Sequence, residues 1–169
     1  MTARSGAVVV DPLRDDDLDA ALALNNAAVP HVNELDLDRL AELRSLSSLA
    51  VAARLEGGFV GFALVMAPGV PYDSPNYRWF NERHDDVRYL DRIAVDPAAR
   101  RAGVGSALYA AVFDHARTEG CPLVGCEVNL EPPNPGSRAF HRSLGFEEVG
   151  RQTTYGDTVV VQLLLAEVD

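Results

Sequence analysis

The chain has 169 residues, of which 47% are hydrophobic and 24% charged, and its formal net charge is −10 at pH 7. This length predicts one globular domain over residues 1–169, and the charge argues against the basic surface needed to bind nucleic acid. No apolar run approaches the roughly 20 residues of a membrane span, and no secretory leader is evident. We therefore expect a cytoplasmic protein with neither nucleic acid nor membrane as a partner. The acidic excess is compatible with a cationic substrate, although it can equally serve solubility alone.

Cysteine and histidine give no sign of a disulfide or a metal site. Cys121 and Cys126 lie five positions apart, and a bond between them would oppose the extended strand predicted for the second. We therefore expect reduced thiols. The histidines are too scattered to gather around a metal ion, and we predict none; they are His31, His84, His115 and His141.

The first third of the chain predicts two helices between a single strand and a hairpin. Acidic residues open the first helix, and Asp36 is a suitable N-cap for the second. A glycine pair between two β-rich apolar runs indicates the hairpin. The predicted elements are a strand at residues 7–10, helices at 15–28 and 37–46, and strands at 49–55 and 59–66.

Residues 67–86 change the character of the chain. They contain three prolines and the single tryptophan of the protein, and they predict a long loop. Such loops often carry function. The aromatic side chains here either cover a substrate or pin the loop to the core, and both interpretations stay open; they are Tyr72, Tyr77, Trp79 and Phe80.

A strand at residues 87–95 breaks at an Asp-Pro pair, and a helix begins after two closely spaced glycines, Gly103 and Gly105. Glycine lets the backbone approach a ligand closely, and a helix N-terminus offers unpaired N–H groups and a partial positive charge. Arg100 and Arg101 add full positive charges beside them. The stretch is a candidate anion site, although a turn that needs glycine for its dihedral angles would give the same pattern.

Two nucleotide-binding signatures do not fit this stretch. Leu108 stands where a dinucleotide-binding turn has its third glycine, and no Gly-Lys-Ser or Gly-Lys-Thr sequence of a P-loop occurs.

The second half of the chain predicts alternating helices and strands. The helix after the glycines has an apolar stripe that should pack on a sheet, formed by Val104, Ala107, Leu108, Ala111, Val112 and His115. The remaining elements are a strand at residues 123–129, a helix from Ser137 as N-cap to 144, and a hairpin at 146–154 and 158–165 around 155–157. This order predicts a mixed α/β layer structure with a largely antiparallel sheet.

Two motifs resemble those of the GNAT superfamily of acyl-CoA-dependent N-acyltransferases. The first is Arg100-x-x-Gly103-x-Gly105, which matches the family's (Q/R)-x-x-G-x-(G/A) signature for the pyrophosphate of acetyl-CoA. The second is Asn134-x-x-Ser137-x-x-x-His141-x-x-x-Gly145-Phe146. Its spacing matches the family's Asn-x-x-Ala-x-x-x-Tyr-x-x-x-Gly-Phe run, with serine in place of alanine and histidine in place of the tyrosine that commonly protonates the departing thiolate.

The resemblance implies a three-layer fold with a twisted, mostly antiparallel sheet of about seven strands and helices on both faces. It also implies that acetyl-CoA binds where two strands splay apart, with main-chain groups near Ile93, Ala94 and Val95 meeting its pantetheine arm. The other cofactor-binding residues implied are Arg100, Arg101, Ala102, Gly103, Val104, Gly105, Ser106, Asn134, Ser137, Phe140 and His141.

The family chemistry is direct attack of an amine on the thioester, so a base must deprotonate an ammonium group. Asp91 is the first candidate and Glu127 the second, and either could instead form a structural salt bridge. Strand alternation places Asp91 on one face with Tyr89, Ile93 and Val95. His141 could act as acid, orient the thioester or serve packing alone.

The resemblance therefore implies an N-acetyltransferase whose acceptor is a primary amine of a small molecule or peptide. A non-catalytic acyl-CoA-binding module and an acyltransferase for a longer acyl group stay open as alternatives, and so does a homodimer. Substrate contacts are expected from Tyr72, Tyr77, Trp79 and Tyr89.

Overall fold

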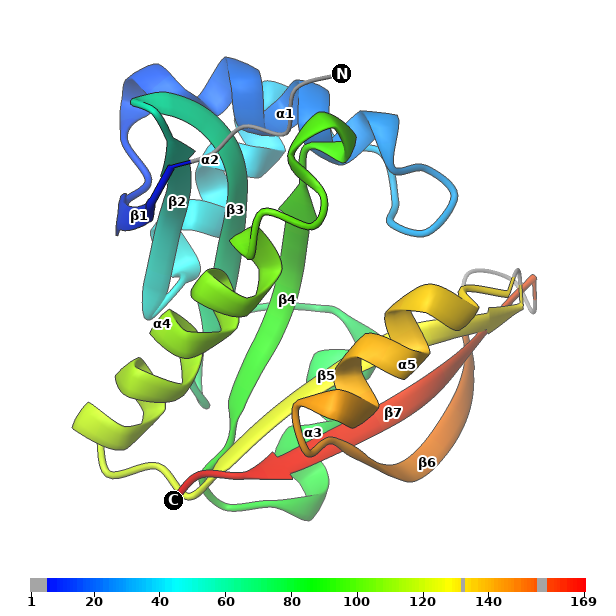
Figure 1. Ribbon diagram of the computed structural model, residues 1–169. Coiled ribbons are helices and arrows are strands. Elements are labelled where there is room, and N and C mark those ends of the chain that lie inside the picture. Colours follow the sequence, from blue (N-terminus) through cyan, green and yellow to red (C-terminus); the bar gives the residue numbers. More distant parts are fainter. Residues whose placement is uncertain (1–5, 132, 155–157) are drawn as a thin grey trace.

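One seven-stranded sheet organises the computed structural model, which describes residues 6–131, 133–154 and 158–169. Its strands are β1 (Val8–Pro12), β2 (Leu49–Leu55), β3 (Gly58–Met66), β4 (Arg88–Val95), β5 (Leu123–Glu131), β6 (Glu147–Thr154) and β7 (Val159–Glu167). Their order is β1-β2-β3-β4-β5-β7-β6, and the neighbouring strands are antiparallel except β4 and β5, which are parallel. The predicted mixed, mostly antiparallel sheet is confirmed (Figure 1).

Helices cover both faces of this sheet, as predicted (Figure 1). On one face lie α4 (Val104–Thr118) and α5 (Pro135–Ser143), and on the other lie α1 (Leu18–Ala27), α2 (Leu37–Leu46) and α3 (Pro75–Arg83). Single 3₁₀ turns, η1 (Asp15–Asp17) and η2 (Pro97–Ala99), precede α1 and α4. Among the described residues, no helix has the length and apolar character needed to cross a membrane.

Each face of the sheet buries its own apolar cluster. The cluster under α4 includes Val104, Leu108 and Val112 of the predicted stripe, joined by Tyr109 from the same helix. The cluster on the other face includes the buried leucines of α2, Leu40 and Leu43. Asp36 caps α2 as predicted, because its side chain accepts a hydrogen bond of 2.7 Å from the Arg39 N–H.

The prediction of a continuous loop at residues 67–86 is wrong, because α3 lies inside it. Its prolines suggested irregular chain, but Pro75 occupies the first turn, where the missing N–H costs nothing. The Ser74 side chain accepts a hydrogen bond of 3.3 Å from the Tyr77 N–H as the cap. Phe80 is fully buried and anchors the helix on the sheet.

The start of α5 also differs from the prediction. The helix begins at Pro135 with Asn134 as N-cap, so Ser137 lies within its first turn and is not the cap. Proline at the helix start again explains the difference. The closing hairpin is confirmed as β6 and β7, and its expected tip at 155–157 lies outside the described residues.

An ion-pair cluster joins the beginning of the chain to β2. The Arg54 guanidinium donates two hydrogen bonds to Asp17, of 2.9 and 2.8 Å, and its Nε donates to Asp11 at 3.0 Å. The Asp17 side chain is only 9% exposed. Hydrogen bonds from Arg54 hold the pKa of Asp17 below its ordinary value, against the opposing effect of burial. The cluster therefore fixes η1, and with it the start of α1, against the sheet.

Replacing Arg54 with methionine should destabilise the protein by about 3 kcal/mol at pH 7, because it leaves the buried Asp17 carboxylate unpaired. Arg14→Met is the control, since Arg14 is 63% exposed in its pair with Asp11 and should matter by less than about 1 kcal/mol. Urea unfolding measures the free energy of unfolding of both variants. Because the pKa of Asp17 is lowered in the folded state, the difference should shrink as the pH falls below the ordinary aspartate range. Equal losses in both variants would contradict this account.

Candidate active site

The parallel strands β4 and β5 diverge soon after they meet. Their paired residues are Arg88 with Val124 and Tyr89 with Gly125. Figure 1 shows the two strands separating beyond this point, with α4 on one side of the gap and α5 on the other. The following residues of both strands, 90–95 and 126–129, line a cavity of about 1060 Å³. The predicted splayed pair thus lies beside the predicted anion site.

The start of α4 forms one end of the cavity. Arg101 and Gly103 have φ of 69° and 81°, a left-handed backbone that turns the chain into the helix. Gly103 has no side chain to cap the first-turn N–H groups, and those groups have no helical carbonyl to bind. Residues 103–106 line the cavity, and so do Arg100 and Arg101, which are both exposed. This arrangement fits a pyrophosphate. Ala102, also predicted here, packs against the core cluster instead.

Gly105 serves helix packing as well as the turn. A Cβ added to it would lie 3.2 Å from Cζ of Phe140, so glycine lets α5 approach α4 closely. Phe140 lines the cavity, and so do the predicted residues Asn134, Ser137 and His141. The two sequence motifs therefore meet at one end of the same cavity.

A β-bulge sets the side chains of β4 at the other end. The register with β3 passes from Arg92 opposite Leu64 to Leu90 opposite Val65, so Asp91 is the extra residue. The prediction from strict alternation is wrong here: Ile93 packs with the cluster under α4, whereas Tyr89 belongs to the opposite cluster. Alternation fails because a bulge shifts the pattern by one residue.

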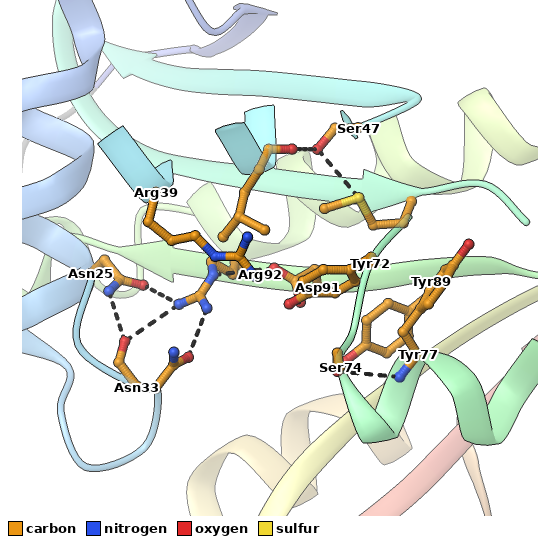
Figure 2. A network of polar contacts seen from close by, with 12 residues as sticks. Asn25, Asn33, Arg39, Ser47, Tyr72, Ser74, Tyr77, Tyr89, Asp91 and Arg92 are labelled. Atoms are coloured by element: carbon orange, nitrogen blue, oxygen red, sulfur yellow. Dashed lines mark hydrogen bonds and ion pairs between the residues drawn. The ribbon is translucent and has the colours of Figure 1, made fainter. Parts of the chain in front are cut away.

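Arg92 connects the bulge to α1 and to the segment that follows it (Figure 2). Its guanidinium donates hydrogen bonds to the side-chain oxygens of Asn25, at 2.8 Å, and Asn33, at 2.7 Å. Its Nε lies 3.1 Å from Asp91 Oδ2, with both side chains nearly inaccessible. Asn25 also binds the Asn33 carbonyl at 3.1 Å. Residues 27–33 are thereby held as a wall of the cavity.

Asp91 has the partners of a structural carboxylate. Besides Arg92, it accepts a hydrogen bond of 2.6 Å from the Tyr72 hydroxyl. Burial raises the pKa of Asp91, and the charge of Arg92 and the bond from Tyr72 oppose that rise. The salt-bridge interpretation of Asp91 thus matches its contacts, and the side chain still lines the cavity.

Of the two carboxylates, Glu127 has the less favourable electrostatic environment. Its Oε2 accepts a hydrogen bond of 2.7 Å from the Tyr89 hydroxyl, and no ion pair among the described residues includes it. Burial raises the pKa of Glu127 to about 8 and the charge of Asp91 adds to the rise, whereas hydrogen bonds with Tyr89 and Asn76 and the charge of Arg92 oppose it. A carboxyl group with this pKa can exchange a proton near neutral pH.

The predicted aromatic contacts divide into two groups. Tyr72 lines the cavity. Tyr77 is buried and donates a 2.7 Å hydrogen bond to the Ala67 carbonyl, and Trp79 packs against Gly150 of β6. Tyr89 is fully buried beneath Glu127. The structure does not bring these last three aromatic residues to the cavity wall, and they anchor the fold instead.

His141 lies in the cavity wall but is only 5% exposed. Its Nδ1 lies 2.6 Å from the Ser137 carbonyl, and its Nε2 is hydrogen-bonded to the Tyr109 hydroxyl. Burial lowers the pKa of His141, which disfavours the imidazolium that an acid role requires. Tyr109 and Arg92 could not be identified from the sequence, because neither belongs to a motif and only the packing of distant elements reveals their partners.

Comparison with known proteins gives one consistent result. The model of the acetyltransferase (GNAT) family matches residues 17–146. An aminoglycoside N(6')-acetyltransferase type 1 of Serratia marcescens is 32% identical over 149 residues, covering 85% of this chain and 94% of that protein.

Solved structures agree at the level of the fold. Ard1 from Thermoplasma volcanium has a TM-score of 0.80 at 18% identity, over 96% of this chain and 99% of that one. YncA of Salmonella typhimurium, a putative acetyltransferase solved with acetyl-CoA, has a TM-score of 0.70 at 21% identity, over 96% and 95%.

The left-handed turn at Gly103 yields a test of the anion site. Gly103→Val should weaken acetyl-CoA binding by about tenfold or more. A β-branched residue disfavours the left-handed backbone at this position, so the first-turn N–H groups would no longer point at the pyrophosphate. Gly69→Val is the matched control: Gly69 has a φ of 87°, equally open surroundings and no place in the cavity wall. Calorimetry on both folded variants measures the affinities. Undiminished affinity in Gly103→Val, or an equal loss in the control, would show that the pyrophosphate binds elsewhere.

Proposed function

Because the chain belongs to the acetyltransferase (GNAT) family, we propose that it transfers the acetyl group of acetyl-CoA to a primary amine by direct attack within a ternary complex. The observation that supports this most is that one cavity holds both an anion-binding helix start and Glu127, a carboxyl group with a raised pKa. The acceptor is a small molecule or a peptide.

The cofactor end of the cavity suits acetyl-CoA, the cofactor of the family. Backbone N–H groups of 103–106 and the charges of Arg100 and Arg101 would hold its pyrophosphate. Main-chain groups of Ile93 to Val95 pair with β3 on one side, and on the other side they face the cavity and would meet the pantetheine arm. Bound there, acetyl-CoA supplies a thioester carbonyl as the electrophile.

The acceptor end suits an amine that arrives protonated. Glu127 removes a proton from the ammonium group, which frees the nitrogen lone pair for attack. Asp91 is already compensated by Arg92, so it contributes position and negative potential while Glu127 takes the proton. Tyr89 orients Glu127 through the 2.7 Å hydrogen bond.

Aminoglycosides are the first acceptors to assay. The 32% identical relative carries that activity in its name, and the net charge of −10 favours the approach of polycationic molecules. A thiol-release assay with acetyl-CoA should therefore include an aminoglycoside, simple diamines and peptides with free N-termini. Turnover of any of these acceptors excludes a module that only binds acyl-CoA, and succinyl-CoA in place of acetyl-CoA tests the longer acyl group. No thiol release with any acceptor would contradict the proposal.

The role of Glu127 predicts a specific pH profile. The base is active when ionised, so kcat/KM for the acceptor should rise as the pH passes through about 8. Glu127→Gln should lower kcat about a hundredfold or more and remove this rise. Glu131→Gln, at the exposed end of the same strand, is the control and should leave the profile unchanged.

The same pKa separates a lost base from a damaged fold. Because the folded state holds the Glu127 proton more tightly than the unfolded chain, stability should fall as the pH rises from the ordinary glutamate range towards 8. Glu127→Gln removes this loss, so its unfolding temperature at pH 8 should equal or exceed that of the wild type. A variant that keeps both its rate and its pH profile would rule out Glu127 as the base.

A further inference from the structure

Tyr109 of α4 and His141 of α5 form a buried polar pair in the cavity wall. Their residues are 1% and 5% exposed, and both line the cavity. The Tyr109 hydroxyl is hydrogen-bonded to Nε2 of His141. Two helices far apart in sequence thus bring their polar groups together beside the predicted cofactor end.

The direction of this hydrogen bond follows from the other side of the imidazole. Nδ1 of His141 lies 2.6 Å from the Ser137 carbonyl oxygen, which can only accept, so Nδ1 carries the proton. A neutral imidazole then has an unprotonated Nε2, and the Tyr109 hydroxyl is the donor. His141 itself has no proton to offer to the cavity in this state.

Packing fixes the tyrosine ring where it is. Phe140 and Phe146 contact it with centroid distances of 5.8 and 5.7 Å in edge-on geometry. The titratable groups that face the hydroxyl are His141 from α5 and Cys126 and Glu127 from β5. The hydroxyl therefore lies between the imidazole and the strand that carries the proposed base.

We propose that the Tyr109 hydroxyl is the hydrogen-bond donor to the sulfur of the thioester, and that His141 is a positioning residue that holds this hydroxyl. The inference rests on the proposed acetyltransferase site, in which the thioester must lie within reach of an amine bound at Glu127. α4 lines the cavity with two hydroxyl-bearing residues, Ser106 in its first turn and Tyr109, and Tyr109 is the one that faces Cys126 and Glu127 of β5.

The donor role needs no net proton transfer from the protein. As the new C–N bond forms and the C–S bond breaks, the electron pair of the C–S bond stays on sulfur. The hydroxyl turns from Nε2 to the sulfur and donates to the negative charge there. Burial raises the pKa of Tyr109 well above its ordinary value, so the phenol keeps its proton. Of the two protons that the ammonium group loses on becoming an amide, Glu127 takes the first and water takes the second, while the thiolate takes a proton from water as it is released.

Binding of CoA, measured without any acceptor, tests this role directly. An ordinary thiol has a pKa of about 8.5, so CoA becomes a thiolate between about pH 7 and 9.5, whereas acetyl-CoA does not ionise there. The affinity ratio of CoA to acetyl-CoA should rise with pH, because Tyr109 stabilises the bound thiolate. Both affinities are measured by calorimetry in the Glu127→Gln variant, so that ionisation of Glu127 does not contribute to the pH dependence of the ratio. Tyr109→Phe should remove the rise, a loss of about tenfold in CoA affinity at the alkaline end.

A variant cycle separates the donor from the residue that positions it. His141→Leu should lower the CoA affinity at alkaline pH in part. His141→Gln should retain more of that affinity, because an amide oxygen can accept a hydrogen bond from the hydroxyl. The Tyr109→Phe/His141→Leu double variant should bind CoA as well as Tyr109→Phe alone does. Additive losses, or an unchanged pH slope in Tyr109→Phe, would overturn the inference. Thermal unfolding checks each fold, and His141→Gln still decides the question if Tyr109→Phe is unstable.

Turnover distinguishes this inference from the proposed function. Where an acceptor is found, Tyr109→Phe should lower kcat about ten- to hundredfold with the KM of the acceptor nearly unchanged. If the wild type releases no thiol with any amine, the proposed function fails while the CoA binding result still stands. If turnover is found but Tyr109→Phe keeps both kcat and the CoA slope, the proposed function stands and the inference fails.

Discussion

The separation of β4 from β5 is the constraint on which the rest of the site depends. Backbone N–H and C=O groups in a sheet interior normally pair with the next strand, and leaving them unpaired away from water is costly. Here the two strands pair at their beginnings and then diverge into a cavity of about 1060 Å³. A bound chain that lies along β4 can use the groups left free on that side. The same divergence makes room for the first turn of α4 at one end and for two carboxylates at the other.

The two carboxylates illustrate how neighbours assign different tasks to similar groups. The bulge at Asp91 places Arg92 beside it, so one acidic side chain has a permanent counter-charge and two further hydrogen-bonding asparagines behind that charge. Glu127, on the facing strand, has a tyrosine hydroxyl as its partner. Burial pushes the pKa of both carboxyl groups upward. At Asp91 the charge of the adjacent Arg92 is the strongest opposing influence, whereas at Glu127 that charge opposes the rise less than the hydrogen bond from Tyr89 does, and the charge of Asp91 adds to the rise. Environments that differ in this way separate an orienting group from a proton-transfer group.

Much of this architecture could be predicted from the sequence because it depends on local chemistry. The cap at Asp36, the glycine hairpin after β2 and the turn before α4 each follow from residues within a few positions of one another. The bulge at Asp91 could not be predicted, since no single residue type marks it and it reverses the alternation that placed Ile93. The same holds for the partnership of Tyr109 with His141, which exists only after α5 has docked on α4.

The most direct test of this account is the ionisation of Glu127 in the acceptor-free protein. Carbon-13 NMR with glutamate labelled at the side-chain carboxyl, assigned by the signal lost in Glu127→Gln, follows that group through a pH titration. The account predicts that the Glu127 signal titrates near pH 8, because burial in the gap between β4 and β5 disfavours its charge. A titration in the ordinary glutamate range, near pH 4.3, would show that water or a cation reaches the carboxylate freely, and it would contradict the assignment of Glu127 as the base.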